Sequence, residues 1–238
     1  MKKHQLNISR YKLIVILFLI AGIIVHGQNN SPNKLYEILK ETVVDYDGNI
    51  YHTIKIGSQI WMMENLQVTH YRNGVPIPNV YDNDKWTNDV YGAYCMVNND
   101  SINYKNTYGV LYNFYAVANK DSLCPKGWHV PTQKECMKLI NFLGGESVAG
   151  KKIKANRPDL WNVDNFEATN ESGFAGLPAG GRGRLGEPCD VGYYATWWSS
   201  TSYDSLYTWH WGLYPDKNSI RSNPGHKSSG FSVRCIKN

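Results

Sequence analysis

The sequence predicts an α+β fold in which antiparallel strands are combined with a few short helices and long ordered loops. Three observations lead to this prediction. Alternating β-prone segments occupy residues 43–62, an amphipathic helix pattern follows at residues 132–143, and strand-like segments return after residue 194. Strands, then helices, and then strands again are typical of α+β domains, whereas a parallel sheet requires strands and helices in strict alternation.

The first segment, residues 43–62, predicts a three-stranded antiparallel meander. Its β-prone stretches are separated by Asp-Gly at residues 47–48 and Gly-Ser at residues 57–58, which are hairpin turn signals. The preceding residues 28–41 are polar and then briefly helix-like, so we interpret them as a leader segment. The domain is therefore expected to span residues 42–238.

The middle of the chain predicts loops and helices. Residues 65–107 are rich in Asn, Asp, Gly, Pro and Tyr without a sustained period, which indicates a long ordered loop region. Apolar spacing predicts a short helix over 110–118. The strongest local signal is a capping box formed by Thr132 and Glu135, followed by an apolar stripe and a glycine pair, which predicts a helix over 132–143. Another short helix is expected over 147–154.

The C-terminal part predicts strands over 194–200, 206–213 and 230–237. A turn signal at residues 203–205 lies between the first and second of these strands, and another at residues 215–218 follows the second. These segments are rich in aromatic residues and complete the predicted α+β order.

The N-terminal residues 1–27 have the pattern of a signal peptide. Basic residues precede an apolar run of about 13 residues, which is shorter than the roughly 20 that cross a bilayer. We expect cleavage after Gly27, export to the periplasm, cell surface or medium, and no stable transmembrane segment afterwards; an uncleaved anchor is the alternative. Removing this segment, with its four basic residues and no acid, lowers the net charge from +5 to +1. A nearly neutral chain without a basic stripe argues against a nucleic-acid partner.

Five cysteines lie beyond the predicted signal peptide, where an oxidising compartment permits disulfides. Their wide spacing resembles no zinc motif, so we expect no metal site and no cofactor. Spacing alone leaves their pairing open. The cysteines are Cys95, Cys124, Cys136, Cys189 and Cys235.

A calcium-loop pattern begins at Asp45, where the sequence DYDGN places oxygen ligands at alternate positions. The twelfth position of such a loop requires a bidentate Glu, and here it is Ile56. A hairpin turn is therefore the favoured interpretation.

Three tryptophans are the candidate ligand-binding residues, because an aromatic face can cover the apolar side of a sugar ring. Trp209 and Trp211 are two apart and should share one face of a strand, whereas of the adjacent Trp197 and Trp198 at most one is expected at the surface. We include Trp198 with Trp209 and Trp211. Core packing is the alternative for each.

No catalytic residue is predicted. His129 and His210 are the histidines nearest to recognisable motifs, but no nucleophile motif such as G-x-S-x-G accompanies them. The GGRG sequence at residues 180–183 does not match a phosphate-binding loop. We interpret these histidines as loop or core residues.

Several blocks of sequence resemble the Fibrobacter succinogenes major paralogous domain and occur in the order of that family. They are DGNIY at 47–51, IGSQIWMMENL at 56–66, YGVLYNFYAV at 108–117, CPKGWHVPT at 124–132, WWSST at 197–201 and SVRC at 232–235. The resemblance implies export by Bacteroidetes or Fibrobacter-like bacteria and a C-type-lectin-like fold, similar to that of formylglycine-generating enzymes. It carries no established activity.

The same resemblance implies a disulfide between Cys124 and Cys235, which match the two flanking cysteines of the family. Cys136 stands where the family usually carries Trp. It is expected to be a buried free thiol or the partner of Cys189, and Cys95 is expected to be unpaired.

These observations together predict an exported lectin-like binding or surface module, without enzymatic activity, that recognises glycan or a surface protein. One alternative is an exported enzyme with a cysteine- or metal-based groove on a similar fold. Another is a purely structural component of the cell envelope. Fold analogy indicates where a ligand could lie and leaves its identity open.

Overall fold

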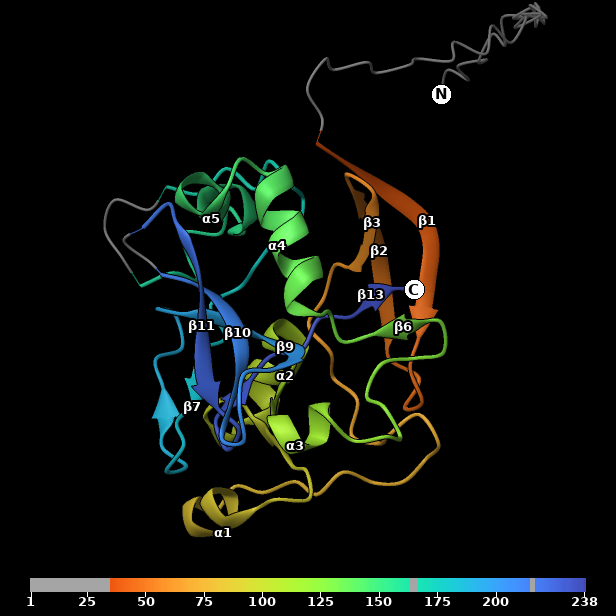
Figure 1. Cartoon of the computed structure of the whole chain (residues 1–238), viewed down its shortest axis with the longest axis vertical. Coiled ribbons are helices and arrows are strands. Elements are labelled where there is room, and N and C mark those ends of the chain that lie inside the picture. The colour runs from red at the N-terminus through yellow and green to blue at the C-terminus, as the bar shows by residue number, and fades with distance from the viewer. Residues whose placement is uncertain (1–34, 163–166, 215–216) are drawn as a thin grey trace, which may run out of the picture. The chain divides into compact units, whose positions relative to one another are not determined.

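The strands form three sheets whose neighbouring strands are antiparallel, within residues 35–162, 167–214 and 217–238, which the computed structural model of the protein describes (Figure 1). Sheets and short helices together make an α+β fold, as predicted. The expected signal peptide, residues 1–27, lies outside the described residues.

The first sheet joins the two ends of the described chain. Its order is β1-β2-β3-β13-β6, so the last strand lies between β3 and β6. The strands β1, β2 and β3 form the predicted meander, with turns at 45–49 and 57–58. The bounds are β1 (Tyr36–Val44), β2 (Ile50–Ile56), β3 (Gln59–Met62), β13 (Ile236–Lys237) and β6 (Trp128–His129).

Strand β1 includes residues 36–41 of the expected leader segment, and residues 28–34 of that segment lie outside the described residues. Seven of its nine residues pair with β2, and the register shifts between Leu39 and Thr42. Helix-like spacing at Leu35, Ile38 and Leu39 is too short to form a stable helix alone, and pairing with a neighbouring strand satisfies the backbone instead. The domain therefore begins before Thr42.

The second sheet contains three strands in the order β11-β10-β9. Strand β11 is absent from the sequence prediction because it contains Pro224 and Gly225. Proline is tolerated here because β11 is an edge strand, where a missing N–H does not interrupt a ladder on both sides. The bounds are β9 (Ala195–Ser202), β10 (Tyr207–Leu213) and β11 (Ile220–His226).

The third sheet has the order β4-β5-β12-β7-β8. The predicted strand over 230–237 is divided, because β12 belongs to this sheet and β13 to the first. The bounds are β4 (Tyr94–Met96), β5 (Val110–Asn113), β12 (Gly230–Phe231), β7 (Gly181–Arg182) and β8 (Pro188–Cys189).

Two predicted helices are confirmed, α4 and α5. Thr132 caps α4 with both bonds of the capping box, to and from Glu135. The predicted helix over 110–118 is wrong in its first half, because 110–113 form the fully buried strand β5 and only one helical turn follows. A short run in which Asn113 is the one amide side chain among apolar and aromatic residues has no period that distinguishes strand from helix. The bounds are α3 (Phe114–Val117), α4 (Gln133–Phe142) and α5 (Glu146–Ile153).

The predicted loop over 65–107 contains two short α-helices, a 3-10 helix and strand β4. Asp82 and Asp100 accept hydrogen bonds from the first turns of α1 and α2, which are ordinary N-cap signals. Each helix buries only one residue, Trp86 or Tyr108, so neither has an apolar stripe that the sequence would reveal. The bounds are α1 (Asn83–Asn88), the 3-10 helix η1 (Val97–Asn99) and α2 (Ser101–Tyr108).

Helix α4 lies between the first and second sheets in Figure 1. Its apolar side, including Leu139 and Ile140, packs with Trp61 of β3 and Trp211 of β10 in one core. A second core contains Trp198 and the cysteines Cys124 and Cys235. The second sheet therefore has a core on each face.

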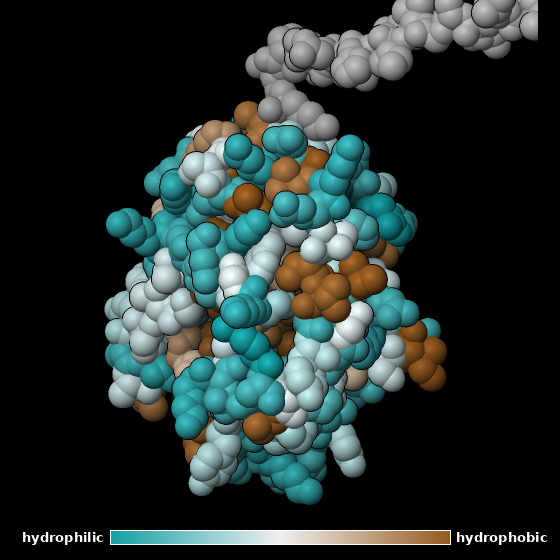
Figure 2. All heavy atoms as spheres, turned by 90° about the vertical axis from the view of Figure 1, so that its right-hand side faces the viewer, coloured by the Kyte–Doolittle hydropathy of each residue, from teal (hydrophilic) through white to brown (hydrophobic). Residues whose placement is uncertain are grey.

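The side of the molecule that carries β1 is mainly hydrophilic, with small separate hydrophobic patches (Figure 2). The exposed apolar side chains of the meander include Ile38, Val44 and Ile50, and the last two are cross-strand partners. None of the described helices combines the length and apolar composition that a membrane crossing requires.

Candidate functional site

The disulfide between Cys124 and Cys235 is confirmed. It joins residues 111 apart in sequence, with a Cα–Cα distance of 6.0 Å. Both cysteines are buried beside Trp198 and Trp128 in one core. The bridge links the segment before β6 and α4 to the segment before β13, and so fixes the end of the chain to the domain.

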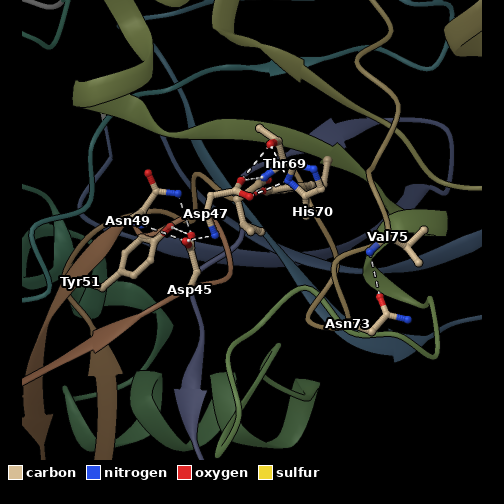
Figure 3. Close-up of polar contacts among 10 residues, drawn as sticks. Asp45, Asp47, Asn49, Tyr51, Thr69, His70, Asn73 and Val75 are labelled. Carbon is tan, nitrogen blue, oxygen red and sulfur yellow. Dashed lines mark hydrogen bonds and ion pairs between the residues drawn. The ribbon is translucent and has the colours of Figure 1, made fainter.

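The calcium-like sequence at residues 45–49 forms a hydrogen-bonded turn (Figure 3). One carboxylate oxygen of Asp45 accepts from the backbone N–H groups of Asp47 and Asn49, each at 3.0 Å. The other accepts from the Asn49 side chain at 2.8 Å and from the Tyr51 hydroxyl at 2.6 Å. Protein donors therefore occupy the carboxylate of Asp45.

Asp47 connects this turn to the segment after β3. Its carboxylate accepts from the Thr69 backbone at 2.5 Å and hydroxyl at 2.8 Å, and contacts His70 Nδ1 at 2.6 Å (Figure 3). Burial opposes ionisation of Asp47, but the bonds from Thr69 and His70 outweigh it, so its pKa is lowered. Across the residues placed by the structure, no group of three or more His, Cys, Asp or Glu could hold a metal ion.

Trp198 and Trp211 are core residues, which corrects their assignment as ligand-binding residues. Both are 0% exposed. Trp198 donates from Nε1 to the Tyr112 carbonyl at 2.7 Å and packs against Phe231. Trp211 stacks on Trp197, with ring centroids 4.7 Å apart. The second sheet is covered on both faces, so alternation along its strands directs side chains into one core or the other.

Trp209 alone of the three candidates lies partly at the surface. It is two residues from Trp211, as predicted, but lies toward the tip of the β9–β10 hairpin. Its ring meets that of Tyr203 edge to face at 5.3 Å, and Tyr207 meets His226 in the same way at 5.5 Å. Tyr203 is 55% exposed and Tyr207 is 38% exposed. We call Tyr203, Leu206, Tyr207 and Trp209 the aromatic hairpin end.

The aromatic hairpin end is held in place by polar contacts of its loop. Asp204 accepts hydrogen bonds from the backbone N–H groups of Leu206 and Tyr207, at 2.8 and 2.7 Å. From the neighbouring turn, Lys227 Nζ donates to the carbonyl oxygens of Asp204 and Ser205. The sequence predicts only a turn at residues 203–205 and does not single out Tyr203 or Tyr207 as site residues. The spacing of Tyr207 two residues before Trp209 is the signal that could have placed both rings on one side of the strand.

Comparison with known families matches residues 54–237 to the Fibrobacter succinogenes major domain. This protein belongs to that family. No curated protein and no solved structure matches the chain.

In this member of the Fibrobacter succinogenes major domain family, Cys95, Cys136 and Cys189 are free thiols. Burial raises the pKa of Cys95 to about 11 and raises that of Cys136 as well. Partial burial and the nearby Glu187 and Asp190 raise the pKa of Cys189. Cys136 is thus a buried free thiol, which is one of the two outcomes expected for it.

In this family member, His129 and His210 both contact side chains that stabilise the fold. His210 contacts the rings of Phe231 and Trp198, and burial lowers its pKa to about 4. His129 Nε2 contacts the Glu135 carboxylate at 3.0 Å, so it extends the capping box of α4. Among the described residues, the His129 ring forms hydrogen bonds with Asn238 and Glu135, and the Ser222 hydroxyl donates to the backbone carbonyl of His210 and not to its ring.

Proposed function

We propose that this protein is an exported binding module that recognises glycan through the aromatic hairpin end. The observation that carries the proposal is the grouping of Trp209 with the exposed rings of Tyr203 and Tyr207. Aromatic faces cover the apolar C–H side of a sugar ring, and the tyrosine hydroxyls can bind its hydroxyl groups.

The loop contacts of Asp204 and Lys227 support this proposal. Because they fix the hairpin tip, the rings lose little conformational freedom when a ligand binds. Tyr and Trp are also side chains with few rotatable bonds and large contact areas. An aromatic surface that is already in its binding conformation therefore suits the flat faces of sugar rings. Binding of a surface protein instead of glycan is the other outcome of the test.

Export to the periplasm, cell surface or medium is part of the proposal and rests on the signal-peptide pattern of residues 1–27. A C-type-lectin-like fold is proposed from the family resemblance. Two features support it: strands β1 and β13 from the two ends of the described chain share one sheet, and a disulfide secures the last strand.

The alternative of a cysteine-based enzyme is less favoured by the chemistry of the free thiols. The reactive form of cysteine is the thiolate, which requires a lowered pKa. The pKa values of Cys95, Cys136 and Cys189 are all raised, chiefly by burial. These thiols therefore remain protonated at neutral pH, and the binding module is the function that we propose.

A glycan array probed with the exported chain tests this proposal. We expect binding by the wild type, and loss of at least tenfold in affinity in Trp209→Ala and Tyr203→Ala. The matched control is Tyr91→Ala, since Tyr91 is 85% exposed and lies outside the aromatic hairpin end. Equal affinity in all four proteins, or binding of a surface protein in place of glycan, would contradict the proposal.

A further inference from the structure

A cleft of about 250 Å3 lies away from the aromatic hairpin end, between the segment after β3 and the C-terminal end of α2. This volume is below the range of about 300–1,000 Å3 that is usual for drug-sized ligands, and indicates a ligand of roughly one sugar unit. Met63 and Leu177 supply apolar lining, and Gln67, Asn106 and Thr107 supply polar groups.

The buried guanidinium of Arg234 also lines this cleft. It is 1% exposed, and Phe174 lies 4.1 Å from it as a ring platform. Its Nε and Nη2 donate to the Asn65 side-chain oxygen, and its Nη1 donates to the Phe174 carbonyl. Asn65 is itself fixed by Trp197 Nε1 and by the Tyr108 carbonyl. The guanidinium therefore has a fixed position.

Arg234 forms no short ion pair within the described part of the chain. The acidic group that acts on its charge is Glu64, which lines the same cleft. The other charged groups of the cleft are already engaged. Glu64 accepts hydrogen bonds from the backbone and Nδ1 of His52, and Arg157 forms a two-point pair with Asp159. A buried charge whose counter-charge is a partly exposed carboxylate outside ion-pair distance is unfavourable, so an anionic group placed beside the guanidinium would be stabilised.

The chemistry of the guanidinium specifies which anion fits. Arginine has five N–H groups, and the three bonds to Asn65 and Phe174 use one on each nitrogen. One N–H remains on each Nη, and this pair suits the two oxygens of a carboxylate. The amide and hydroxyl groups of Asn106 and Thr107 suit the hydroxyl groups of a sugar. We propose that the cleft binds a carboxylate-bearing sugar unit of the uronic acid class, with Arg234 as its counter-ion.

Calorimetric titration of the full chain with sodium glucuronate, and with glucose as the neutral probe, tests the proposal. We expect saturable binding of glucuronate and none of glucose at equal concentrations. Thr107→Trp should fill the rim and weaken binding at least tenfold. Ile102→Trp is the matched control, because Ile102 lies on the same helix, is 89% exposed and does not line the cleft.

Two charge variants test the role of Arg234. Glu64→Gln removes a negative charge from the cleft and should strengthen glucuronate binding by about two- to fivefold, the range for a partly exposed charge. Arg234→Lys should weaken binding at least tenfold, with folding checked by circular dichroism. If that variant does not fold, Glu64→Gln and Thr107→Trp still decide the proposal.

The proposal is overturned if glucuronate does not bind, if glucose binds equally well, if Thr107→Trp and Ile102→Trp behave alike, or if Glu64→Gln weakens binding. None of these variants belongs to the aromatic hairpin end. The cleft and the proposed glycan-binding surface can therefore fail independently.

Discussion

Strand β10 carries two tryptophans, two residues apart, that have opposite surroundings. Trp211 is 0% exposed and contacts Trp197, Phe174 and Trp61, whereas Trp209 lies partly at the surface against Tyr203. Both project toward the same side of the strand. The difference shows that burial depends on position along β10 and not on the face alone, because Trp211 packs in one core with residues of α4 whereas Trp209 lies against Tyr203 near the hairpin loop. We call the part of β10 around Trp211 its inner half and the part around Trp209 its outer half.

Loss of the disulfide should have the largest effect on the stability of the buried part of the domain, because Cys124 and Cys235 lie in the core with Trp198, on the other face of the second sheet from Trp211. For the double variant Cys124→Ser/Cys235→Ser, the chain-entropy model gives up to ~4.7 kcal/mol for a closed loop of roughly this length. Urea denaturation of the two proteins measures the change. A free energy of unfolding equal to that of the wild type would show that the bridge is not required where the core meets the end of the chain.

Trp211→Ala should have the next largest effect. Truncating a fully buried Trp typically costs about 3–5 kcal/mol, and here the stack with Trp197 is also lost. The midpoint of urea denaturation should fall accordingly, or the variant should fail to fold. A cost below about 1 kcal/mol would remove the distinction between the inner and outer halves of β10.

His210 lies between the two tryptophans and should make stability depend on pH. Burial lowers its pKa from 6.5 to about 4, so the unfolded state binds more protons between these values. The free energy of unfolding should therefore be unaffected by protonation of His210 above pH 6.5. It should fall as the pH drops from 6.5 toward 4, by at most about 3 kcal/mol. Urea denaturation of wild type and His210→Gln from pH 7 to 4 measures it; parallel curves would refute the assignment.

Trp209→Ala should have the smallest effect on stability. Because its ring is only partly buried, we expect a loss of about 1 kcal/mol or less, although glycan binding should be lost. The same urea titration used for Trp211→Ala provides the direct comparison. A loss as large as that of Trp211→Ala would place Trp209 in the core and exclude it from a binding surface.

Local chemistry made several elements predictable from the sequence. Helix α4 follows from its capping box and apolar stripe, and the meander of β1, β2 and β3 follows from its two turns. The disulfide followed from the family resemblance, since the spacing of five cysteines alone left its partners open. Each of these features depends on residues close together in sequence or on a motif of the family.

The sequence by itself therefore determined the α+β class, the best-capped helix and a candidate aromatic residue, Trp209. Only the tertiary structure decided which tryptophans are buried, because that depends on α4 and β12 packing onto the second sheet from distant parts of the chain. It also decided that β11 forms despite Pro224 and that Arg234 meets Asn65 across the core. Such contacts join residues far apart in sequence, so no local period or turn signal records them.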